Sequence, residues 1–398
     1  MRFKVLYILF VISSLLYSNL HLPFGVTPRH IMTILMFLVC LFEDRHLFMD
    51  KWFGIYLIFI AGFAISSAWT GYLGNFLWYL AGFYFVAYVG YWASHILLKK
   101  YDGAKTVVTL LVIIGMIDAS VTIGQFFNVS YLTDISSMLL LNIDTEFLDA
   151  INEGEEAYGF SLPGILLSDV YNGYFLLVIG ILCLYYLKDG IRLLKLIPWF
   201  ISIITSYMIQ QRSAFYILLL ISIFVFFKFM LSDRSRFKWL YMVALVLFLP
   251  FAIESLRVFL LEGQSRFSIG MDSTNRDVIY RKSFDFIQEN FIWGGRFKMR
   301  ASGAAAAHNL FLNAWIYGGL IGVFVIIWLF VKQCISAFKV FFQKVNNQRV
   351  FSFVFGMAFM GFTLNSMLHN ASVVSGDFLI WILWGCFAAS LQRESVCK

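Results

Sequence analysis

Charge is scarce in this 398-residue sequence: Asp, Glu, Lys and Arg make up only 13% of it, whereas soluble proteins carry roughly 25%. So few charged side chains cannot cover the surface of a soluble domain of this size. Separate soluble domains are also excluded, because no polar interval is long enough to form one and no Pro-rich or Ser-rich linker divides the chain. We therefore expect a single domain over residues 1–398.

Cysteine is scarce too, with five in the chain. Cys40, Cys183 and Cys386 fall inside apolar segments, and Cys334 and Cys397 fall on the side interpreted below as cytoplasmic. None lies on the outer face, so we expect no disulfide. No Cys or His spacing resembles a metal site, and no metal, cofactor or nucleic-acid partner is expected.

Apolar runs, in contrast, are abundant: 61% of the residues are hydrophobic, and runs of about 16–22 residues recur along the whole chain. This pattern indicates an all-α, polytopic membrane protein with about 12 transmembrane helices and a partly helical outer-face loop. An alternative joins 196–211 and 213–231 into one long helix, which would reverse every later orientation. The predicted spans are 4–20, 28–42, 52–70, 74–97, 104–126, 166–187, 196–211, 213–231, 238–255, 308–331, 350–368 and 377–391.

The distribution of positive charge predicts the orientation of these spans. If the N-terminus is cytoplasmic, 20 of the 30 Lys and Arg residues fall on the cytoplasmic side, and every cytoplasmic loop is basic. We therefore expect both termini inside. Two long outer loops result, an acidic one at 128–166 and a basic one at 256–307.

The basic loop carries eight of the ten outer cations, against the positive-inside trend. One interpretation is a solvated loop with internal ion pairs such as Arg281–Asp285. The other is a site for an anionic, lipid-linked substrate, because the guanidinium fork of arginine binds phosphate oxygens bidentately. On the second interpretation the candidate binding residues include Arg281, Arg296 and Arg300.

Within this loop, 273–293 is predicted to form an amphipathic helix along the membrane surface, with Tyr280, Phe284, Ile287 and Phe291 on one stripe. Arg276 falls beside that stripe and would need an anionic partner there. The Gly294-Gly295 pair that follows predicts close approach of backbone to a ligand.

His308-Asn309 opens the next span, and a regular helix would place His308, Gly319 and Gly322 on one face. A histidine at a helix start is often structural, but imidazole can also take a proton from an attacking hydroxyl at neutral pH. Two further polar residues lie in apolar surroundings. Arg212 is either functional or a snorkelling arginine that satisfies helix-end carbonyls, and Asp118 has no assignable partner.

These features together resemble the O-antigen ligase/polymerase superfamily. The resemblance covers roughly 154–322 and rests on Arg212-Ser213 at the start of a span and on Tyr158-Gly159-Phe160 with Pro163. It also rests on the Arg276–Trp293 helix before Gly294-Gly295, and on His308-Asn309 with nine residues before Gly319-x-x-Gly322. The chain departs from the family pattern at Ile292-Trp293, where members often carry a proline.

The resemblance implies a metal-independent glycosyltransferase at the outer face of a bacterial cytoplasmic membrane, acting on undecaprenyl-diphosphate-linked glycans as donor and acceptor. Arginines would hold the diphosphate, with Arg212 and His308 catalytic and Arg276, Arg281, Arg296, Arg300 and Asn309 binding substrate. A polymerase is favoured over a ligase that transfers the finished chain to lipid A-core. A flippase for lipid-linked sugar is the alternative from another class. Membrane lipid, a chain-length regulator and a flippase are the expected partners of a polymerase.

Overall fold

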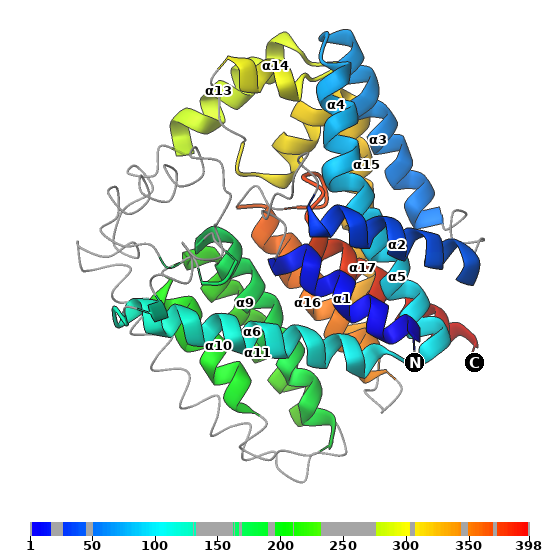
Figure 1. Ribbon diagram of the computed structural model, residues 1–398. Coiled ribbons are helices and arrows are strands. Elements are labelled where there is room, and N and C mark those ends of the chain that lie inside the picture. The colour runs from blue at the N-terminus through cyan, green and yellow to red at the C-terminus, as the bar shows by residue number, and fades with distance from the viewer. Residues whose placement is uncertain are drawn as a thin grey trace.

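The computed structural model describes residues 2–16, 27–44, 51–129, 131–132, 162, 164–166, 169–189, 196–209, 211–231, 276–302, 307–343, 349–368 and 372–396. Within these residues the chain is helical, with no β-strand (Figure 1). The predicted all-α class is therefore confirmed for the described part.

Eleven of the twelve predicted spans contain a helix, and the twelfth, 238–255, lies outside the described residues. The agreement is close because the backbone N–H and C=O groups of a long apolar run cannot bond to water, and a helix lets them bond to each other. In the described part of the chain, three helical stretches are both long and apolar enough to cross a membrane: Leu73–Tyr101, Ala104–Phe126 and Leu310–Phe342. The main helices are α1 (Arg2–Leu16), α2 (Pro28–Glu43), α3 (Lys51–Trp69), α4 (Leu73–Tyr79), η3 (Leu80–Tyr84), α5 (Phe85–Tyr101), α6 (Ala104–Phe126), α9 (Asp169–Cys183), η4 (Leu184–Asp189), α10 (Ile197–Met208), α11 (Arg212–Leu231), α13 (Arg276–Glu289), α14 (Arg296–Ala301), α15 (Leu310–Phe342), α16 (Val350–Ser366) and α17 (Phe378–Val396).

The two predicted spans 196–211 and 213–231 form two helices, α10 and α11, rather than one long helix. The indole N–H of Trp199 donates to the hydroxyl of Ser222 at 2.9 Å, and the Trp199 ring lies 4.9 Å from that of Phe226. The start of α10 therefore lies beside the later part of α11, so the two helices form a hairpin. The single long helix that would have reversed the later orientations is excluded.

Packed helices run in the relative directions that alternate crossing requires. Tyr7 in α1 bonds to Ser94 in α5 at 2.8 Å, and Phe3 stacks on Tyr101 at 4.9 Å, so α1 and α5 are antiparallel. The same reversed order is found between α9 and α16, in the Tyr174–Phe362 and Tyr185–Phe351 ring pairs at 5.7 and 4.7 Å. In both of these pairs the two helices thus have opposite directions, as in the topology predicted from the distribution of positive charge.

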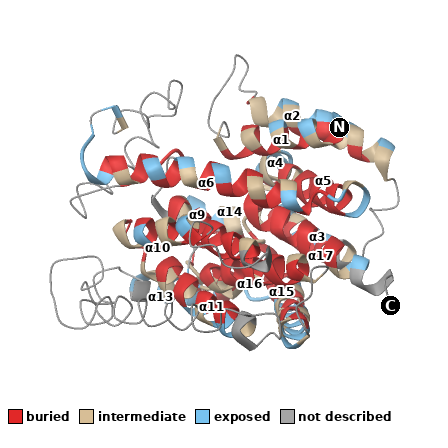
Figure 2. Cartoon of the chain, turned by 90° about the horizontal axis from the view of Figure 1, so that it is seen from below, coloured by how far each residue is buried: buried red, intermediate tan, exposed pale blue. Residues whose placement is uncertain are grey.

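Burial is concentrated in the central helices, and the periphery is apolar. Nearly every residue of α9 and α16 is buried (Figure 2). Large apolar side chains nevertheless remain exposed on the outer helices, including Phe42 at 81% and Phe324 at 66% exposure. An apolar exterior of this kind is compatible with contact to lipid.

One end of the molecule is a lobe built by α13 and α14 against α3, α4 and the start of α15 (Figure 1). The predicted amphipathic helix is present as α13, but only part of its predicted stripe is buried. Ile287 is buried in a small core with Met299 of α14 and Ile316 of α15, whereas Phe284 and Phe291 are about half exposed. The position of this helix relative to a membrane surface stays a prediction.

Candidate functional site

The lobe is held by contact between two stretches of backbone. Helix α15 breaks at Gly319, where φ is 58° and ψ is −148°. The break exposes backbone groups that the Gly294-Gly295 turn satisfies: Gly295 N–H donates to Ile316 O at 2.8 Å, and Leu320 N–H donates to Ile292 O at 3.1 Å. The loop and the helix therefore replace the hydrogen bonds that the break removes.

One sequence prediction is wrong at this point, and another stays a prediction. The Gly294-Gly295 pair contacts α15 closely, since a Cβ at Gly294 would lie 2.6 Å from the carbonyl oxygen of Trp315, and its approach to a ligand stays a prediction. The wrong prediction is that His308, Gly319 and Gly322 share one face of a regular helix. The helix begins at Leu310, after His308, and is interrupted at Gly319. The angle of about 100° per residue does not apply across such a break.

Arg296 follows this turn directly and is thereby placed on Tyr317. Its guanidinium carbon lies 5.2 Å from the centre of the Tyr317 ring, and its side chain is hydrogen-bonded to the Tyr317 hydroxyl. Tyr317 is also hydrogen-bonded to Tyr79 of α4. Burial disfavours the charge on Arg296, but the phenol oxygens of Tyr317, Tyr79 and Tyr84 together outweigh that effect and raise the pKa of the guanidinium. Arg296 is therefore a fixed positive charge.

A cavity of about 630 Å³, here called the outer pocket, opens between α4 and α14. Its walls are mainly aromatic, and its polar groups include the exposed guanidinium of Arg300 and the amide of Asn75. Aromatic faces suit the C–H face of a pyranose ring, and the guanidinium suits an anionic oxygen. The lining residues are Tyr72, Asn75, Trp78, Tyr79, Phe83, Phe297, Arg300 and Ala301.

His308 and Asn309 lie immediately before the first residue of α15. His308 is half-buried and has the left-handed φ of 46°, and Asn309 is the N-cap. The Asn309 carboxamide oxygen accepts from the backbone N–H groups of Phe311 and Leu312, and its amide donates to Met367 O at 3.1 Å. Asn309 thus caps α15 and ties it to the end of α16. This structural role is sufficient to explain an asparagine at the position.

The other predicted site residues lie on different elements. Arg212 is the half-buried first residue of α11, close to Tyr216 on the same helix. Arg276 is the first residue of α13, but its side chain lies outside the described part. Arg281 and Asp285 are both exposed on α13. The structure therefore places Arg300 in the outer pocket and Arg296 on Tyr317, near the pocket residue Tyr79, and it describes no shared contact for Arg212, Arg276 and Arg281.

A charged cluster that the sequence analysis did not single out lies beside the outer pocket. Arg29, in the first turn of α2, has its guanidinium carbon 5.5 Å from the centre of the Phe83 ring. Asp377, Tyr171 and Tyr79 provide the electrostatic environment of Arg29. Of the ten cations predicted to be on the outer side, only Arg29 and Arg212 lie outside the basic loop. This position was the sequence feature that could have identified Arg29 as a candidate.

Asp118 has a structural partner. Its carboxylate accepts from the backbone N–H of Ile165 at 2.9 Å. Nearby, Gln125 accepts from Gly164 N–H at 3.0 Å, and Asn172 donates to Leu162 O at 3.0 Å. Buried polar side chains of α6 and α9 therefore hold Leu162 and the turn at 164–166.

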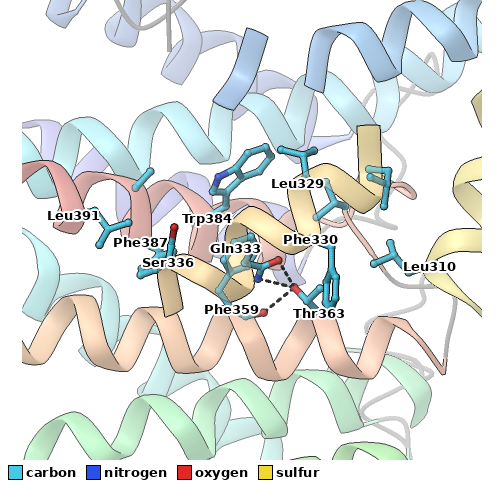
Figure 3. A pocket seen from close by; sticks show the side chains of 13 residues that line it. Leu310, Leu329, Phe330, Gln333, Ser336, Phe359, Thr363, Trp384, Phe387 and Leu391 are labelled. Atoms are coloured by element: carbon cyan, nitrogen blue, oxygen red, sulfur yellow. Dashed lines mark hydrogen bonds between the residues drawn. The ribbon is translucent and has the colours of Figure 1, made fainter. Parts of the chain in front are cut away.

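A second cavity, narrow and apolar, lies between α15, α16 and α17 (Figure 3). It starts at Leu310 and extends to Leu391. Its polar side chains are largely satisfied within the wall: Gln333 donates to Thr363 Oγ1 at 2.8 Å, and Thr363 donates to Phe359 O at 2.8 Å. No charged side chain is among the described residues that line this cavity.

No group of three or more His, Cys, Asp or Glu side chains that could hold a metal ion is found in the described ranges. A comparison with models of known protein families found no match, and a comparison with curated proteins found none either.

Proposed function

We propose that the protein is a glycosyltransferase of surface-polysaccharide assembly, most similar in role to an O-antigen polymerase. It would transfer an undecaprenyl-diphosphate-linked glycan onto a lipid-linked repeat unit at the outer face of the bacterial cytoplasmic membrane. About twelve transmembrane crossings, with both termini cytoplasmic, belong to the same proposal. The observation that carries it is the outer pocket, in which aromatic walls meet the guanidinium of Arg300 beside the fixed charge of Arg296.

The proposed reaction joins an acceptor hydroxyl to the anomeric carbon of the donor sugar. The bond from that carbon to the diphosphate oxygen breaks, and the diphosphate leaves with its negative charge held by arginines. The hydroxyl proton passes to a base, for which His308 is the candidate. Arg212, Arg276 and Arg281 stay candidates for contacts to the diphosphate, through interactions that form when substrate binds.

A ligase would use the same pocket and the same leaving group but a lipid A-core acceptor, so the two functions differ only in the acceptor. A flippase is less favoured, because a transporter site usually lies between helices near the midplane, whereas the outer pocket lies at one end of the molecule.

Deletion of the gene, followed by gel analysis of surface polysaccharide, tests the proposal. We expect core carrying a single repeat unit. Bare core with accumulated lipid-linked chains would identify a ligase, and loss of all translocated units would identify a flippase. Normal long chains in the deletion strain would contradict all three functions. Restoration by the wild-type gene, but not by an Arg296→Gln, Arg300→Gln double variant, would link the phenotype to the outer pocket.

A further inference from the structure

Arg29 reaches the wall of the outer pocket from a distant part of the sequence. The Phe83 ring beneath its guanidinium stacks on Tyr79 at 4.6 Å and 27°, and both aromatic rings line the pocket. Thr27 caps α2 just before Arg29, and Phe37 of the same helix packs on Phe85 at 5.1 Å. Arg29 is therefore held on a fixed helix end and packs on Phe83, a residue of the pocket wall.

The charge of Arg29 is not neutralised by an ion pair with any described residue. The nearest carboxylate that acts on it, Asp377, is already committed. Its Oδ1 accepts from Leu379 N–H at 3.0 Å and from Ile380 N–H at 3.4 Å, and the Tyr171 hydroxyl is also hydrogen-bonded to it. Asp377 therefore caps α17, and it acts on Arg29 through space without forming an ion pair among the described residues.

The Nε of Arg29 is fully buried and has no hydrogen-bond partner among the described residues. A buried guanidinium without a paired anion is costly. An anionic ligand would satisfy it, and arginine is suited to phosphate oxygens because its donors form a planar fork.

We propose that Arg29 is a second anion-binding residue of the outer pocket and that it acts with Arg300 to hold the diphosphate of a glycosyl lipid between them. This inference rests on the proposed function for the identity of the ligand. A diphosphate carries more than one negative charge, so cations from two walls match it better than one. An acidic sugar would present the same kind of anion, and the test below separates the two sources.

Calorimetric titration of the full chain in nanodiscs with geranyl diphosphate, a short lipid diphosphate, tests the assignment. Arg29→Gln should weaken binding about tenfold or more, the loss expected for a charge-assisted hydrogen bond. The affinity of Arg29→Lys for geranyl diphosphate should lie between those of Arg29→Gln and the wild type, because lysine keeps the charge but loses the fork. Arg393→Gln is the matched control, since Arg393 is exposed and pairs with Asp102 near the opposite end of α17, and it should bind normally.

Wild-type affinity in Arg29→Gln would overturn the proposal. If Arg29→Gln does not fold, wild-type affinity in Arg29→Lys would overturn it instead. A parallel titration with a galacturonate oligosaccharide distinguishes the source of the anion: a loss of binding there, with geranyl diphosphate unaffected, would assign Arg29 to an acidic sugar and overturn the diphosphate assignment.

The result is separable from the proposed function. Diphosphate binding that depends on Arg29, in a protein that extends no glycan, would contradict the glycosyltransferase and leave this inference standing. Glycan extension that is insensitive to Arg29→Gln would overturn the inference alone.

Discussion

Gly295 donates its backbone N–H to the carbonyl oxygen of Ile316 at 2.8 Å, in the helical turn before α15 breaks. This bond fixes the start of α14 on α15 and places Arg296 over Tyr317. The position of the arginine therefore depends on a loop-to-helix contact that leaves no space for a side chain at Gly294 or Gly319.

Replacing Gly319 by alanine should destabilise the protein. A Cβ there would overlap the carbonyl oxygen of Ile292, and the positive φ is itself unfavourable for alanine. We expect the free energy of unfolding to fall by at least about 1–3 kcal/mol, which would be measured as a lower melting temperature in detergent. Gly54→Ala is the control, because nothing lies within 4 Å of a Cβ at that position in α3. Equal melting temperatures for the two variants would contradict the described docking.

Replacing Arg296 should reduce glycan transfer without unfolding the protein. Arg296→Lys keeps a positive charge but loses the bidentate fork and most of the flat contact with Tyr317, so it should retain only part of the activity. Lys298→Gln on the same short helix is the control, since Lys298 is exposed and contacts Asn290. The measurement is transfer by purified protein, with protein amounts matched. Full activity in Arg296→Gln would remove Arg296 from the site.

His308 should be required for transfer if it acts as a base. General-base catalysis typically contributes about 10²–10⁴-fold, so His308→Gln should reduce the transfer rate by that order. A base must be unprotonated to accept a proton, so wild-type activity should fall as the solution becomes more acidic. The measurement is a pH profile of transfer by the wild type and by His308→Gln. A nearly active His308→Gln with the wild-type profile would leave only a structural role at the helix entrance.

Asp118 should prove structural. Asp118→Asn keeps an oxygen to accept from Ile165 N–H, so both stability and transfer should stay close to wild type. Asp118→Leu removes that acceptor and leaves a buried N–H unpaired, at a cost of about 1–3 kcal/mol. Thermal unfolding and transfer are measured together. A stable but inactive Asp118→Asn would instead show that the negative charge itself is needed.

Reporter fusions test the direction of the chain through the membrane. Fusions after residues 150 and 290 should report the outer compartment, and fusions after 103, 236 and 345 should report the cytoplasm. The reason is the charge distribution along the loops. A cytoplasmic signal at 290 would contradict the proposed outer site, because α14 and the outer pocket follow that position directly.

The helices were predictable because an apolar run is a local property. The α10–α11 division and the bounds of α6 follow from the sequence to within about three residues. The break at Gly319 was not predictable, since it depends on hydrogen bonds donated and accepted by a loop more than twenty residues earlier. Arg296 and Arg300 were predictable from their place in a basic loop. Arg29 was not, because its relevance comes from Phe83 and Asp377, which only the folded chain brings near it.

The interruption of α15 also determines how deep the chemistry would lie in a bilayer. The predicted span ends just before Lys332, and a helix from Gly319 to Lys332 rises about 20 Å at about 1.5 Å per residue. The hydrocarbon core is roughly 30 Å thick, so it would extend beyond Gly319. The turns before Gly319, which carry Tyr317 and receive Arg296, would then lie just below the lipid headgroups. A lipid-anchored phosphate would meet the arginine by entering slightly below the headgroup level, with its lipid tail still in the membrane.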